Sequence, residues 1–142
     1  MAEPHPALLM FIASRYAEMR VRGALAAEGF ELSPAQARVM ARVADDGTRL
    51  TDLAEQAQIT KQSAGFLVDQ LERAGYAERV PDPTDARARL VRIAPRGRAA
   101  QRLARTVEQD ISREWEEHLG AERMAGLQDA LVSLREITDP WA

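Results

Sequence analysis

The chain has 142 residues, of which 46% are hydrophobic and 29% are charged, and it carries a net charge of −3. This composition is too apolar for a disordered protein and predicts one globular domain over residues 1–142. The absence of cysteine excludes disulfides, zinc–thiolate sites and thiol redox sensing, and it fits a cytoplasmic location. We expect neither a membrane segment nor a signal peptide, because the apolar runs are short and no basic stretch precedes the first one.

The first predicted helix covers residues 6–29. Leu8, Ile12, Tyr16 and Met19 recur at intervals of three to four residues, which indicates one apolar helix face. Gly29 is placed to end this helix as a C-cap residue.

The second predicted helix opens at Ser33 and extends to about residue 44. Ser33 is a candidate N-cap, Pro34 suits the first helical position, and Gln36 completes a capping box. The side chains expected to face the core are Ala37, Met40 and Ala41.

A helix-turn-helix unit is predicted next. Thr51 and Thr60 are the expected N-caps of two helices, which Gln58 and Ile59 join by a tight connection. The second of these helices ends before Gly75. Two helices joined by a tight turn form the helix-turn-helix unit.

A β-hairpin is predicted directly after this unit, with strands at residues 76–80 and 90–94. The helix-turn-helix unit and this hairpin together predict a winged helix-turn-helix lobe over residues 33–95. Between Arg79 and Arg105 there are eight arginines and two aspartates, a local charge of +6 (8 − 2) in a chain whose net charge is −3. A charge run can be only a solvated face, but a basic edge on an acidic chain is typical of DNA-binding proteins.

The helix after Thr60 shows an unusual polar face. Opposite the expected core residues Ala64, Leu67, Val68, Leu71 and Ala74, this face carries Gln62, Phe66, Asp69 and Arg73, with Gly65 beside them. A helix in the major groove would use both unusual residues, since glycine lets the backbone approach and a phenyl ring can contact the thymine methyl group. The alternative is that Phe66 packs under the hairpin or in an interface.

Two helices are expected at the C-terminal end, at residues 96–119 and about 121–137, separated by Gly120. Leu103, Val107, Ile111 and Trp115 recur every four residues in the first of them. This apolar stripe and the one on residues 6–29 exceed what one small lobe can cover, so we expect residues 6–29 and 96–138 to form a homodimer. The predicted fold is mostly α with a small β-hairpin: a winged helix-turn-helix flanked by N- and C-terminal dimerisation helices.

The wing carries a specific pattern: Glu78-Arg79, Pro81-Asp82-Pro83, Asp85-x-Arg87-x-Arg89, Val91-Arg92-Ile93 and Gly97. With these motifs, residues 32–98 resemble the winged-helix core of the multiple-antibiotic-resistance regulator (MarR) family, and the flanking helices fit the family too. The resemblance implies a homodimer with interlocking terminal helices. It also implies a regulator of transcription, with repression as the expected sign, that binds a pseudo-palindromic operator.

The resemblance also implies roles for single residues. Arg87 matches a wing arginine that enters the minor groove, and Asp85 matches the carboxylate that supports it. Residues 61–66 fall where the recognition helix meets the bases, although many members have serine or threonine followed by arginine where this chain has Gly65-Phe66. The predicted DNA-binding residues are Thr51, Thr60, Lys61, Gln62, Ser63, Gly65, Phe66, Arg73, Arg79, Asp85, Arg87 and Arg89.

A small-molecule site is a further implication of the resemblance. Family members bind small aromatic or phenolic molecules, often aromatic acids, between the dimer helices and the DNA-binding lobe. The residues that could line such a cleft here are Arg15, Tyr16, Met19, Trp115 and His118. The alternative is that Tyr16, Met19 and Trp115 are simply the core of the dimer.

The sequence also bears on two other function classes. An enzyme is disfavoured because the chain has no cysteine, only two histidines and no catalytic or phosphate-binding motif. No cofactor or metal site is expected, since the glutamates near His118 scatter around their helix. A winged helix used only for protein contacts would suit a neutral wing, and this wing is basic.

Overall fold

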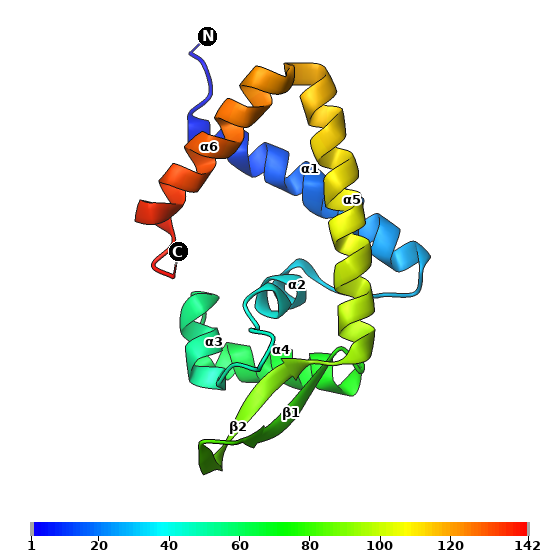
Figure 1. The fold of residues 1–142 in the computed structure, drawn as a ribbon, viewed down its shortest axis with the longest axis vertical. Coiled ribbons are helices and arrows are strands. Elements are labelled where there is room, and N and C mark those ends of the chain that lie inside the picture. Colours follow the sequence, from blue (N-terminus) through cyan, green and yellow to red (C-terminus); the bar gives the residue numbers. More distant parts are fainter. Residues whose placement is uncertain (1, 142) are drawn as a thin grey trace. The chain divides into compact units, whose positions relative to one another are not determined.

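The computed structural model describes residues 2–141 and shows a winged helix between flanking helices (Figure 1). The elements are α1 (Pro6–Ala27), α2 (Pro34–Ala41), α3 (Leu50–Gln56), α4 (Lys61–Arg73), β1 (Ala77–Asp82), β2 (Asp85–Ile93), α5 (Pro95–Leu119) and α6 (Ala121–Thr138). The predicted fold class is confirmed. No described helix has the length and apolar character needed to cross a membrane.

The chain divides into two compact units. One is Leu32–Arg102, and the other joins the residues up to Glu31 to those from Leu103 on. The first unit contains the predicted lobe of residues 33–95. The second holds α1, the larger part of α5, and α6, the helices predicted to form the dimer.

The core of Leu32–Arg102 draws on all of its elements. Its largest fully buried side chains come from α2, α3, α4 and the start of the wing: Val39, Leu53, Val68, Leu71 and Tyr76. β1 and β2 form one antiparallel hairpin, paired from Ala77↔Ile93 to Asp82↔Asp85. In Figure 1 the hairpin directly follows α4, and α5 leaves from the end of β2.

The capping box of α2 is confirmed, because Gln36 N–H donates to Ser33 Oγ (3.1 Å) and Ser33 N–H donates to Gln36 Oε1 (2.9 Å). The predicted end at residue 44 is wrong, since the helix ends at Ala41. Ala37 and Ala41 are exposed rather than buried. A helix of eight residues turns only two side chains fully inward, Val39 and Met40.

The predicted cap at Thr51 is wrong, because α3 begins one residue before it and has Arg49 as its N-cap without a side-chain hydrogen bond. The start of α3 is set by a distant segment: Thr48 N–H donates to Val91 O (2.9 Å), and Val91 N–H donates to Thr48 O (2.8 Å). This bridge ties Thr48, two residues before the helix, to β2.

The turn between α3 and α4 has the expected tight form. Gln58 adopts φ +57°, a left-handed conformation uncommon outside glycine. Ile59 N–H closes the turn on Ala54 O at 3.0 Å. Thr60 caps α4 as predicted, accepting the Ser63 N–H at 3.0 Å.

The wing is packed closely on the start of α5. A Cβ atom on Gly97 would lie 2.2 Å from the carbonyl oxygen of Tyr76 and 2.8 Å from Ile93 Cγ2. Only glycine therefore fits where α5 meets the first residue of the wing.

The second unit is built from long helices with few buried side chains. α1 ends at Ala27, two residues before the predicted bound, and its C-cap is Glu28 rather than Gly29. Gly29 follows the cap with φ +83° and reverses the chain, and Phe30 N–H donates to Leu25 O at 2.9 Å. α5 and α6 meet at Gly120 (φ +87°), where the chain turns sharply (Figure 1). Leu25 and Ile111 are buried, and α6 has no buried residue.

Candidate DNA-binding surface

The outward face of α4 is the one expected from its helical spacing. Gln62, Asp69 and Arg73 are exposed, and 60% of Phe66 is accessible. On the opposite face Ala64, Val68 and Leu71 are buried; Ala74 was also expected there, but it is the C-cap residue and is exposed. Phe66 therefore does not pack under the hairpin within this chain.

Gly65 is not required by packing within the chain. A Cβ atom at this position would make only ordinary contact with Leu50 Cδ2, at 3.7 Å. Glycine inside a helix costs about 1 kcal/mol relative to alanine, and no close packing at this position offsets that cost.

The first turn of α4 is exposed but locally ordered. The Thr60 hydroxyl accepts the Ser63 N–H and donates to Ser63 Oγ at 2.9 Å. Lys61 and Gln62 are exposed beside this pair. The turn therefore presents a cation, an amide and two hydroxyl groups.

Arg79 is bound within the protein. Its guanidinium lies 2.9 Å from Asp69 Oδ1 and 3.1 Å from Glu72 Oε1, and its backbone N–H donates to Glu72 Oε2 at 3.1 Å. Both carboxylates belong to α4, so Arg79 joins β1 to that helix. It also neutralises Asp69, an acidic side chain on the outward face that would otherwise repel phosphate.

The tip of the wing is organised by Asp82, whose side chain is only 6% exposed. Its Oδ1 accepts hydrogen bonds from the N–H and the hydroxyl group of Thr84, both at 2.8 Å. Its Oδ2 accepts a hydrogen bond from Arg49 Nε at 2.9 Å and forms an ion pair with Arg49 Nη2 at 2.7 Å. The hydrogen bonds from Thr84 and Arg49 lower the pKa of Asp82. The hydrogen bond between Arg49 and Asp82 also raises the pKa of Arg49.

Asp85 supports Arg87 through the backbone. Its Oδ1 accepts the Arg87 N–H at 3.0 Å, and its Oδ2 lies 3.9 Å from Arg49 Nη2. Arg87 and Arg89 are exposed, and within residues 2–141 neither guanidinium has an ion-pair partner.

Other arginines of the basic segment have internal partners. Arg92 pairs with Glu78 across the hairpin at 3.3 Å. Arg96 lies over the ring of Tyr76, 4.6 Å from its centroid, and donates to Ala74 O at 2.9 Å. The local excess of arginine thus divides into side chains that hold the wing and side chains that face outward.

Sequence reasoning missed Arg49 and the role of Asp82. The run Asp82-Pro83-Thr84 carries a usable signal, because an aspartate two residues before a threonine in a turn commonly accepts its backbone N–H. Nothing near Arg49 in the sequence indicates its partner, which lies 33 residues away.

The candidate ligand residues lie on α1 and α5. Arg15 lies over the ring of Phe11 (6.0 Å), and Met19 and His118 are exposed. Trp115 is half-buried and Tyr16 is exposed.

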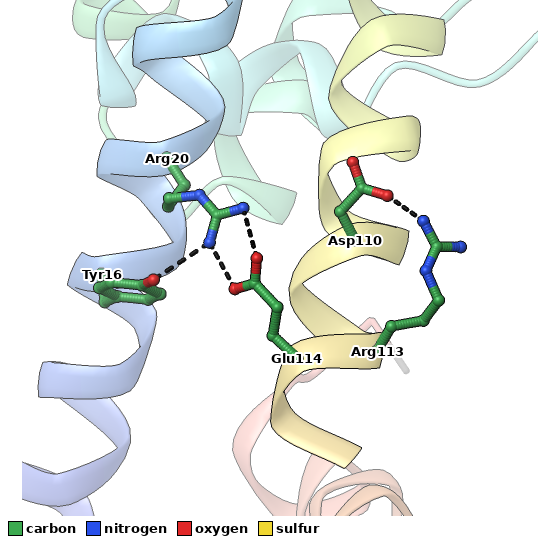
Figure 2. A network of polar contacts seen from close by, with 5 residues as sticks. All are labelled: Tyr16, Arg20, Asp110, Arg113 and Glu114. Carbon is green, nitrogen blue, oxygen red and sulfur yellow. Dashed lines mark hydrogen bonds and ion pairs between the residues drawn. The ribbon is translucent and has the colours of Figure 1, made fainter. Parts of the chain in front are cut away.

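Beside them, Arg20 of α1 forms a two-pronged ion pair with Glu114 of α5, at 2.6 and 3.0 Å, and donates to Tyr16 Oη at 3.0 Å (Figure 2). The hydrogen bonds that Arg20 donates to Glu114 lower the pKa of Glu114. The pKa of Arg20 is raised by its hydrogen bonds to Glu114 and Tyr16. Among residues 2–141, no three histidine, aspartate or glutamate side chains are grouped to hold a metal ion.

Comparisons with known proteins agree with this architecture. The sequence model of the MarR family matches residues 30–88. The HTH-type transcriptional regulator FarR of Neisseria gonorrhoeae is 31% identical over 108 residues, which cover 73% of this chain and 72% of the relative.

Solved structures show the same fold. The transcriptional regulator PA4135 superposes with a TM-score of 0.71 at 26% identity, covering 96% of this chain and 99% of the other. A mutant MarR from E. coli complexed with operator DNA superposes with a TM-score of 0.70 at 22% identity, covering 90% of this chain and 91% of the other.

The lowered pKa of Asp82 predicts a defined pH dependence of stability. Asp82 stays ionised to a lower pH in the folded state than in the unfolded chain. Its ion pair therefore stabilises the fold at neutral pH. This contribution is lost as the pH falls through the folded-state pKa. The difference in melting temperature between wild type and Asp82→Asn should therefore be largest near pH 7 and shrink below about pH 4. Asp46→Asn, which changes an exposed turn carboxylate, is the control and should have little effect at any pH. A difference for Asp82→Asn that stays constant from pH 7 to pH 3 would contradict the assignment.

Proposed function

The chain belongs to the MarR family of transcriptional regulators, and from this we propose that it binds a pseudo-palindromic DNA operator as a homodimer and represses transcription. Members of this family are regulators and not enzymes. The observation that carries the proposal is the outward face of α4, where Phe66 is 60% exposed on a helix followed directly by a wing with unpaired arginines.

We place α4 in the major groove. Its first turn offers Lys61, Gln62 and Ser63 to base edges and phosphates, as recognition helices commonly do. Gly65 would let the backbone approach the duplex, and Phe66 would contact a thymine methyl group. Thr51, in the first turn of α3, is suited to a phosphate contact through its hydroxyl group. Thr60 would have to release the hydrogen bond that its hydroxyl donates to Ser63 Oγ before it could donate to a phosphate.

We place the wing along the adjacent minor groove. Arg87 is the proposed minor-groove residue, and Arg89 is suited to a neighbouring phosphate. Arg73, in the last turn of α4, is a further exposed cation on the helix. The net charge of −3 does not oppose this, because exposed charges are screened over about 8 Å at physiological ionic strength.

The homodimer is supported by exposed apolar surface in the second unit. On α1, Phe11 is 58% exposed and Met19 65%; on α6, Ile137 is 84% exposed. Other exposed apolar side chains on these helices are Leu8, Leu9, Ile12, Leu131, Val132 and Leu134. Apolar surface of this extent marks an interaction site in a soluble protein. A two-fold dimer would present two copies of α4 to half-sites one helical turn apart.

We also propose a cytoplasmic regulator whose operator binding is relieved by a small aromatic or phenolic ligand. The candidate residues on α1 and α5 offer both a cation, Arg15, and aromatic surface, Tyr16 and Trp115. Met19 and His118 complete the set. If the helices instead bury Tyr16, Met19 and Trp115 between protomers, they form dimer core and no ligand site.

The dimer can be tested by sedimentation. Wild type should be dimeric at micromolar concentration, and Phe11→Asp should shift it toward monomer because a carboxylate would have to be buried in the interface. Phe66→Asp is the matched control, since Phe66 is exposed to nearly the same extent (60% against 58%) but lies on α4. It should remain dimeric. A stable, folded wild-type monomer at this concentration would contradict the dimer.

The role of Phe66 can be tested with a duplex that the wild-type protein has selected from a randomised library. Phe66→Ala should weaken binding to this duplex by about 1–3 kcal/mol, the range for one lost base contact. It should leave binding to random DNA and the melting temperature nearly unchanged, because the ring is exposed and neutralises no phosphate.

Lys61→Ala is the control for that experiment. It removes a charge at the same end of α4, so it should weaken binding to both DNAs. An equal loss on both DNAs for Phe66→Ala, together with a lower melting temperature, would make Phe66 a packing residue in an interface.

A further inference from the structure

The wing is fastened to the helices at three levels. Arg79 binds Asp69 and Glu72 of α4, near the start of β1. The backbone bridge between Thr48 and Val91 fixes β2 beside the segment that leads into α3. Arg49, the N-cap residue of α3, binds Asp82 at the far end of β1. The third contact is the one that reaches the tip.

We infer that Arg49 is a positioning residue for operator binding, which holds the wing tip and thereby Arg87 in a fixed place relative to α4. This inference rests on the proposed function. Arg49 lies 2.7 Å from Asp82 and 3.9 Å from Asp85 through the same Nη2 atom, and the other oxygen of Asp85 holds the Arg87 N–H at 3.0 Å. One guanidinium thus connects α3 to both carboxylates of the tip.

The chain of contacts continues to the recognition helix, because α3 packs directly against α4. An isolated two-stranded hairpin is at best marginally stable in water, so the tip would otherwise move independently of α4. With the tip fixed, the protein does not have to order it when DNA binds, and such preorganisation strengthens binding.

Two simpler roles for Arg49 make different predictions. Its side chain is 45% exposed, so it could instead contact a phosphate directly. In that case removing Asp82, a negative charge, should leave DNA affinity unchanged or raise it. If the ion pair only stabilises the fold, both changes should lower the melting temperature without altering affinity well below that temperature.

If Arg49 positions the wing tip, removing the positive charge of Arg49 and removing the negative charge of Asp82 should weaken DNA binding equally. Arg49→Ala and Asp82→Asn should each weaken binding to the selected duplex by about tenfold, equivalent to 1.4 kcal/mol, and the double variant should lose no more than either alone. Arg92→Ala is the matched control, because Arg92 is also 45% exposed and also pairs with a carboxylate. Arg92 and its partner Glu78 both lie in the hairpin, so this pair does not connect the wing to a helix. Arg92→Ala should weaken binding less than either variant.

Hydrogen exchange on the free protein supplies a readout that does not depend on DNA. In Arg49→Ala, the backbone amides of Thr84 and Arg87 should exchange faster than in wild type, whereas Arg92→Ala should leave them unchanged. If Arg49→Ala fails to fold, Arg49→Lys decides the question by the same measurements, since it keeps the charge and loses the two-pronged contact.

Each outcome decides one claim. Affinity that is unchanged or raised in Asp82→Asn, or unchanged exchange at Thr84 and Arg87, would overturn the positioning role. If wild type bound no DNA selectively, the proposed function would fail, and the exchange data would still show whether Arg49 holds the tip. Equal loss in the two single variants with faster exchange at both amides would support the inference.

Discussion

A carboxylate buried at the end of a hairpin is the constraint on which the winged-helix lobe depends. An ionised Asp82 with 6% of its side chain exposed would be strongly destabilising without partners. Thr84 satisfies one oxygen and folds the turn, and Arg49 satisfies the other and attaches the turn to α3. The same carboxylate therefore shapes the tip and fixes it to the helices of the lobe, α3 and α4.

This arrangement explains how an acidic chain can present a basic edge. Arg49, Arg79 and Arg92 are bound by carboxylates of the same lobe, so they contribute mainly to holding the wing. Arg87 and Arg89 have no such partner among the described residues and lie at the surface. Pairing, more than the count of arginines, thus decides which charges are available to a phosphate backbone.

The features that sequence predicted correctly depend on local chemistry. Ser33 with Gln36, Thr60, and the glycines that end helices act on backbone groups a few residues away, so their roles could be inferred from spacing alone. Thr51 misled the prediction because its type favours a cap, whereas the start of α3 is set by the bridge from Thr48 to Val91. The partners of Arg49 and the exposure of Ala37 and Ala41 depend on tertiary contacts that no local pattern contains. The DNA contacts were inferred from the outward face of α4 and from the resemblance of the wing to the MarR family, and they remain predictions.

The central claim, that unpaired arginines of a fixed wing bind DNA through their charge, is tested most directly by the salt dependence of affinity. The slope of log affinity against log salt concentration should decrease in magnitude by about one for Arg87→Ala, because a guanidinium in the minor groove neutralises phosphate charge and displaces counterions as a phosphate contact does. Arg92→Ala, whose charge is already paired with Glu78, should leave the slope unchanged. Equal slopes for wild type and Arg87→Ala, measured on the selected duplex, would contradict the account.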